Sequence, residues 1–242
     1  MGYDGIIIIF LIGATVVAIS YILDHVWAAT IPSRRIYYII RAPGVILHEG
    51  AHMLGCILTG ARIKNVVLFS KNGGSVTYTR PLLPYLGDVI ISTAPLFVIP
   101  LVLSGITDLF RIYLGCTFPA FPPQIVTPEA LLALGSAIIG TFRANLVTGF
   151  NGWFLLYLYL TISLVLSVSP SRQDMKNATV GIALLLLAAL MILGSGIPAA
   201  VGFLDRCLNL LEVGFTLGLV YGIIALLVSF PLIVLYAYRM GR

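Results

Sequence analysis

Long apolar runs separated by short polar breaks dominate this chain and set the first expectation about its fold. The first run, 6–23, has the length that an α-helix needs to cross the roughly 30 Å hydrocarbon layer of a bilayer. Further spans are expected at 43–59, 86–103, 131–146, 153–168, 179–193 and 213–236. The pattern therefore predicts an all-α polytopic membrane protein with about six or seven transmembrane helices.

A glycine-bearing turn between two β-prone stretches predicts one small β-hairpin. The stretches 66–70 and 75–79 contain Val, Phe, Thr and Tyr, and they flank Lys71-Asn72-Gly73-Gly74. Asn and Gly readily adopt the positive φ angles that tight hairpin turns require. We expect the hairpin to lie at the membrane interface. There it either connects two spans or offers a strand edge to an extended substrate.

Proline and polar residues indicate how the apolar runs are connected. Segment 24–41 contains Pro32 and two adjacent arginines, and is expected to be an interfacial stretch. Pro43 disfavours a helical conformation at the residue before it and suits the first turn of a helix. A new helix is therefore expected to start at Pro43 and to stop near Gly60. The proline-rich piece 118–128 is expected to be a connector.

Composition and charge support this membrane interpretation. Hydrophobic residues make up 60% of the chain and charged residues 10%, with a mean hydropathy of +1.06. These values exclude an ordinary soluble domain and predict a single integral membrane domain, 1–242, in the cell membrane. The net charge of +5 is spread over segment ends. The expected partner is thus the lipid bilayer and not nucleic acid. The three cysteines are far apart and predict no disulfide framework.

The residues that suggest chemistry are His48-Glu49-Gly50-Ala51-His52, an H-E-x-x-H motif inside an apolar segment. Side chains four residues apart on a helix point in the same direction, so His48 and His52 can bind one Zn²⁺. Glu49 is then placed beside the metal as the general base of a metalloprotease. Cys56 continues this helix face but lies about 12 Å from His48 along the axis, and we assign it to packing.

A catalytic zinc usually has three protein ligands and an open position for water, so a third ligand must come from elsewhere. Asp174 is one candidate, because it lies in a polar break between two apolar runs. Irregular backbone near membrane depth is tolerated where it lines a cavity. Ser171 and Asp174 also form the pattern of a helix capping box, and the local sequence does not separate the two interpretations.

Two other residues are weaker candidates for the third ligand. Glu212 lies in an apolar run, where an ionisable group is costly unless it is paired or functional. We favour its pairing with Arg143, which is also stranded in an apolar stretch, over ligation of the metal. His25 follows the first span, where an interfacial histidine is ordinary.

Three features together resemble the site-two protease family of intramembrane zinc metalloproteases. They are the segment that runs from Pro43 through His52, the turn Thr93-Ala94-Pro95, and the downstream polar break that carries Pro170 and Asp174. The resemblance implies that zinc is bound by His48, His52 and Asp174, and that Glu49 activates water.

The chain also departs from the pattern of that family. Asp174 is followed by Met175 where the family has glycine, and Thr-Ala-Pro replaces Ala-Gly-Pro. A serine-rich stretch stands where the family commonly has an asparagine that could stabilise an oxyanion. These departures indicate a divergent member.

The sequence thus predicts a zinc metalloendopeptidase that cleaves transmembrane proteins or peptides within the bilayer. Two alternatives remain open at this point. One is a non-catalytic membrane protein that uses the same histidines to bind or transport a metal, although transporters usually carry more intramembrane acids than this chain does. The other is a gluzincin-like membrane protease in which Glu212 replaces Asp174 as the third ligand. The sequence does not indicate an oligomeric state.

Overall fold

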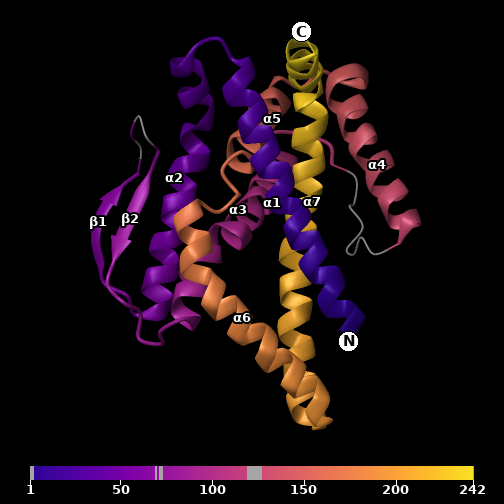
Figure 1. The fold of residues 1–242 in the computed structure, drawn as a ribbon. Helices are drawn as coiled ribbons and strands as arrows, with labels where there is room; N and C mark the ends of the chain where they lie inside the picture. The colour runs from indigo at the N-terminus through magenta and orange to yellow at the C-terminus, as the bar shows by residue number, and fades with distance from the viewer. Residues whose placement is uncertain (1–2, 69, 71–72, 119–126, 242) are drawn as a thin grey trace.

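The computed structural model of the protein describes residues 3–68, 70, 73–118 and 127–241, and within them the fold is a helical bundle with one small sheet (Figure 1). The N-terminal half contains α1 (Tyr3–Thr30), α2 (Arg34–Thr59), β1 (Ile63–Val67), β2 (Ser75–Tyr78) and α3 (Leu86–Tyr113). The C-terminal half contains α4 (Pro128–Phe142), the π-helix η1 (Arg143–Thr148), α5 (Gly152–Val165), α6 (Arg172–Ser195) and α7 (Pro198–Met240).

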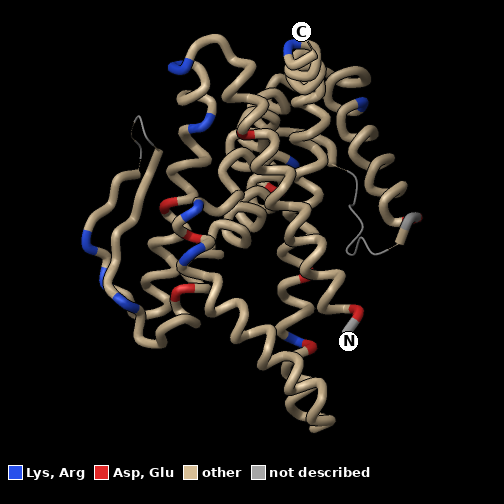
Figure 2. The backbone as a smooth tube through the Cα atoms, viewed as in Figure 1, with Lys and Arg blue, Asp and Glu red and all other residues tan. Residues whose placement is uncertain are grey.

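The expectation of an all-α membrane protein is confirmed, with a correction to the number of spans. Five helical segments in the described part are long and apolar enough to cross a membrane: α1, α3, α4 with η1, α6 and α7. The expected spans at 43–59 and 153–168 are not among the five: α5 has only 14 residues, and α2 combines three arginines near its start with the polar residues of the H-E-x-x-H motif. Charged residues are sparse along the helices (Figure 2). The chain is an integral, multi-pass membrane protein.

The first and last helices pack side by side and run in the same direction. Gly13 of α1 lies against the ring of Phe215, whereas Gly218 and Gly222 of α7 lie against Val16 and Ile19. Because the contact positions advance together along both helices, α1 and α7 are parallel (Figure 1). Glycine at these positions lets the two helices approach closely, as small residues do in membrane helix pairs.

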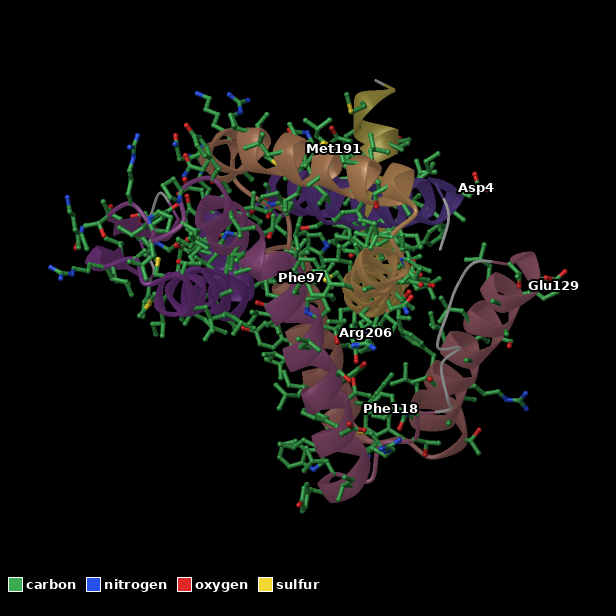
Figure 3. The ribbon with its side chains drawn as sticks, turned by 90° about the horizontal axis from the view of Figure 1, so that it is seen from below. Asp4, Phe97, Phe118, Glu129, Met191 and Arg206 are labelled. Carbon is green, nitrogen blue, oxygen red and sulfur yellow. The ribbon has the colours of Figure 1, made fainter. Side chains whose placement is uncertain are left out.

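Helix α3 lies between α2 and α7 and joins the two sides of the bundle. Its Phe97 points toward α7 (Figure 3), where the ring centroid lies 5.0 Å from that of Phe215. Deeper in the bundle, Thr107 of α3 is hydrogen bonded to the hydroxyls of Tyr157 and Tyr221, at 3.2 and 3.0 Å. These contacts hold α3 in place. Helix α3 carries Ile91, whose backbone carbonyl contacts the site described below.

Helix α2 passes through Pro43 without a break, so the expected helix start at that residue is wrong. Pro43 has no N–H to donate to the carbonyl of Ile39, which would leave that oxygen unpaired. The hydroxyl of Tyr159 on α5 donates to Ile39 O at 3.2 Å instead. The next amide, Gly44 N–H, donates to Ser163 Oγ at 3.0 Å. Segment 24–41 is accordingly helical except at 31–33.

The two strands form the expected antiparallel hairpin, with Val66 opposite Val76 and Val67 opposite Ser75. The first strand begins and ends earlier than the sequence suggested, and much of the turn falls outside the described residues. The hairpin packs beside α2 on a small apolar cluster of Cys56, Ala61 and Ile91. Most of the expected connector at 118–128 also falls outside the described residues.

Candidate metal centre

The two histidines of the motif lie on one buried face of α2. Their Nε2 atoms are 3.1 Å apart, and the side chains are turned so that the ring planes meet at 81°. His48 and His52 are only 9% and 6% exposed. The one-turn spacing along the helix therefore brings two ligand atoms to a single point inside the protein.

Each histidine is oriented by a backbone carbonyl at its other ring nitrogen. The Nδ1 of His48 lies 2.5 Å from Ser167 O, and the Nδ1 of His52 lies 2.8 Å from Ile91 O. A carbonyl oxygen only accepts, so both Nδ1 atoms carry the proton and donate. Both Nε2 atoms are then left with a free lone pair. This arrangement is typical of metal-binding histidines, whose second nitrogen is held by a carbonyl or a carboxylate.

Asp174, in the first turn of α6, approaches the same point from another part of the fold. Its Oδ1 lies 3.6 Å from His52 Nε2 and its Oδ2 lies 3.9 Å from His48 Nε2. The carboxylate also accepts a 2.8 Å hydrogen bond from the Ser171 amide, and Ser171 Oγ accepts one of 3.2 Å from the Asp174 amide. The capping box and the approach to the histidines are thus properties of one side chain, although the sequence presented them as alternatives.

The three side chains fit a zinc ion. Bonds of 2.0–2.2 Å in tetrahedral geometry place ligand atoms about 3.3 Å apart. The two Nε2 atoms are 3.1 Å apart, Asp174 Oδ1 lies 3.6 Å from His52 Nε2, and Asp174 Oδ2 lies 3.9 Å from His48 Nε2. One ligand atom from each of the three residues can be chosen so that all three lie within 4.8 Å of one another. Two imidazole nitrogens and one carboxylate oxygen are a typical set of protein ligands for catalytic zinc. With three protein ligands, the fourth coordination position stays open for water.

Glu49 lies beside this cluster on α2 and is 6% exposed. Its side chain is covered by the backbone at Gly74, just before β2, so closely that a Cβ atom there would overlap Glu49 Cγ. The hairpin therefore forms one wall of the space around the glutamate. A second link ties the hairpin to α6: Asn177 Nδ2 donates to the Tyr78 hydroxyl at 3.4 Å. Burial raises the pKa of Tyr78 further above neutral pH.

The other candidate ligands do not join the cluster, within the residues that the structure describes. Glu212 is 4% exposed, and its Oε2 has no hydrogen-bond partner there. The expected pairing of Glu212 with Arg143 is wrong, because the Arg143 side chain is exposed at the start of η1. His25 instead contacts the Tyr236 hydroxyl at 3.1 Å. Cys56 lies in the apolar cluster beneath the hairpin.

Sequence reasoning missed the groups that orient the site. Ser167 and Ile91 act through their carbonyl oxygens, which every residue type carries, so no sequence signal could have identified them. Gly44 is different, since a Cβ there would overlap the Ser163 carbonyl oxygen. A glycine four residues before the first histidine was a visible sign that another segment comes close to α2.

The helices and the cluster together define a class: a multi-pass membrane protein with a buried His-His-Asp centre that suits a metal ion. Residues 11–107 match the family model described as Peptidase M50B-like, and this match supports the resemblance to the site-two protease family. The matched region includes His48, Glu49 and His52 and ends well before Asp174. No curated protein and no solved structure matches the chain.

Proposed function

We propose that this protein is an intramembrane zinc metalloprotease, a zinc metalloendopeptidase that acts as one domain over residues 1–242. The observation that carries the proposal is the meeting of His48, His52 and Asp174 from two distant helices at one buried point, beside Glu49. The family match supports the same activity, since its members are described as peptidases. The donor set supports zinc as the cofactor.

The residues of this chain divide the chemistry among them. His48, His52 and Asp174 would hold the zinc, which supplies Lewis-acid polarisation of the scissile carbonyl and acidifies water. Glu49 takes the proton of the attacking water and later passes it to the leaving amine. The carbonyls of Ser167 and Ile91 keep the two imidazoles in the tautomer that leaves Nε2 free.

The proposed substrate is a transmembrane protein or peptide. Its backbone carbonyls are tied up in helical hydrogen bonds, so a substrate helix must unwind locally before a peptide bond can be attacked. Among the described residues, no further strand pairs with the outer edges of the two-stranded sheet next to Glu49, so these edges can accept such an extended segment as an added strand. The hairpin would then bring the scissile bond to the general base.

The experiment that tests the proposal is the Glu49→Gln variant, purified in detergent and reconstituted in liposomes with a transmembrane peptide. We expect cleavage to fall by about 10²- to 10⁴-fold, because the amide cannot accept the proton, while bound zinc stays stoichiometric. Glu129→Gln is the matched control, since Glu129 is exposed at the start of α4 and outside the cluster. A wild-type protein that binds zinc but cleaves nothing, or a Glu49→Gln variant that cleaves at the wild-type rate, would refute the proposal.

A further inference from the structure

Gly74 and Glu49 touch across the boundary between the hairpin and α2. A Cβ placed on Gly74 would overlap Glu49 Cγ and would lie 2.7 Å from both Cδ and Oε1. Real Cβ atoms essentially never come within 3.0 Å of another heavy atom, so no other residue type fits position 74 while Glu49 stays in place. The contact therefore involves the carboxylate group of Glu49 as well as its Cγ methylene group.

The two glycines of the turn are required for different physical reasons. Gly73 has a φ of +96°, a conformation that side chains disfavour, and it has open space around its Cα. Gly74 does not have a positive φ, and its neighbour Glu49 is what excludes a side chain. In the Gly-Gly sequence, the first glycine therefore allows the backbone conformation of the turn, and the second leaves room for Glu49.

The contact limits where the Glu49 carboxylate can go. Glu49 has three rotatable side-chain bonds, and a glutamate on a helix surface loses considerable rotamer freedom when it is fixed. The backbone at Gly74 covers Cγ, Cδ and Oε1 from the hairpin side, so conformers that swing toward the hairpin are blocked. A proton-accepting group must be held close to its target, and an error of about 1 Å is costly in rate.

We propose that Gly74 is a positioning residue for Glu49: its bare backbone confines the general base to the side of the two histidines and keeps water from its other face. This inference rests on the proposed protease function. It predicts that the hairpin contributes to the rate of the chemical step in addition to any contact that it makes with substrate.

The first test is the Gly74→Ala variant, with Gly105→Ala on α3 as the matched control. Both changes add one methyl group, and the Cβ at position 105 would meet no atom within 4 Å. We expect Gly74→Ala to lower kcat at least 10-fold, with KM and bound zinc unchanged, because only the base is displaced. The control should keep the wild-type kcat. A Gly74→Ala variant with wild-type kcat, or one in which KM alone rises, would overturn the positioning role.

The second test measures the contact without any activity. Glu49→Ala removes Cγ and Cδ, the atoms that the new methyl group would strike. We expect Gly74→Ala to lower Tm in the protein that retains Glu49 and to leave Tm unchanged in the Glu49→Ala background. An equal loss of Tm in both backgrounds means that Gly74 serves the turn alone, and it overturns the inference. If wild type cleaves no peptide but the Tm coupling is present, the protease function has failed while the contact stands.

Discussion

Oδ1 of Asp174 lies 3.6 Å from Nε2 of His52, although the two residues belong to α6 and α2. The same carboxylate closes the first turn of α6 by accepting from the Ser171 amide at 2.8 Å. The cap is made by Oδ2 and holds the side chain in the orientation that directs the other oxygen, Oδ1, to His52. The start of a membrane helix thereby becomes part of the proposed metal site, and the two roles can be separated by mutation.

Asp174→Asn and Asp174→Ala should separate these roles. Asparagine keeps an oxygen that accepts from the Ser171 amide, so the cap survives, but a neutral amide is a poor zinc ligand. We expect both variants to lose bound zinc, measured by mass spectrometry of the metal. Only the alanine variant should also lose about 1 kcal/mol from the missing cap.

Ser171→Ala is the matched control for that pair. It removes the hydroxyl that accepts from the Asp174 amide at 3.2 Å and leaves the carboxylate in place. Zinc should remain stoichiometric, with a stability loss of about 1 kcal/mol. Stoichiometric zinc in the Asp174→Asn variant would remove Asp174 from the proposed ligand set.

Gly44→Ala should damage the site from a distance. The added methyl group would overlap the Ser163 carbonyl oxygen and lie 2.6 Å from Ser167 Oγ, so α5 must move away from α2. The Ser167 carbonyl that orients His48 moves with it. We expect a stability loss of about 1–3 kcal/mol or more and weaker zinc binding, measured by thermal unfolding and metal titration.

Gly50→Ala offers the comparison, because it adds the same methyl group to the same helix where no atom lies within 4 Å. Alanine is favoured over glycine in helices by about 1 kcal/mol, so this variant should keep its zinc and gain slightly in stability. If the two variants have equal stability and equal zinc content, the close packing of α2 on α5 does not maintain the geometry of the site.

Glu212→Met should stabilise the protein. Glu212 is 4% exposed with an unpartnered Oε2, and Thr216, one turn further along α7, also has a buried hydroxyl without a partner among the described residues. An unpaired buried polar group costs about 1–3 kcal/mol, and methionine fills a similar volume without that cost. We expect a higher Tm with unchanged zinc content. Loss of zinc would restore Glu212 as a ligand.

Removal of the metal should destabilise the wild-type protein and leave the Asp174→Asn variant unaffected. A ligand that binds only the folded state at 100 times its Kd adds about 2.7 kcal/mol to the free energy of unfolding. A chelator should therefore lower the Tm of wild type, and added zinc should restore it. A Tm that does not respond to the chelator would argue against a zinc ion bound by these three side chains.

The parts of this structure that depend on local sequence were predictable. Apolar runs of sufficient length indicated the membrane helices, and the spacing of His48 and His52 placed two imidazoles on one helix face. Residue Asp174 was ambiguous, because a capping box and a distant ligand require the same carboxylate. Only the family resemblance favoured the second interpretation.

The expectations that failed depended on contacts between helices. Pro43 was expected to begin a helix, but Tyr159 of another helix compensates for its missing amide donor. Arg143 was expected to reach Glu212, but it begins the π-helix η1 and its side chain is exposed. Tyr159 is far from Pro43 in the sequence, and Arg143 is far from Glu212. No pattern within a single apolar run could therefore have shown whether the two residues of each pair make contact.

The shared direction of α1 and α7 has a topological consequence. If both helices cross the bilayer, the Asp4 end of α1 and the Arg239 end of α7 must emerge in different compartments (Figure 1). Reporters fused at these two termini would then give opposite accessibility readings in sealed vesicles, and together they would assign which compartment faces each end of the bundle.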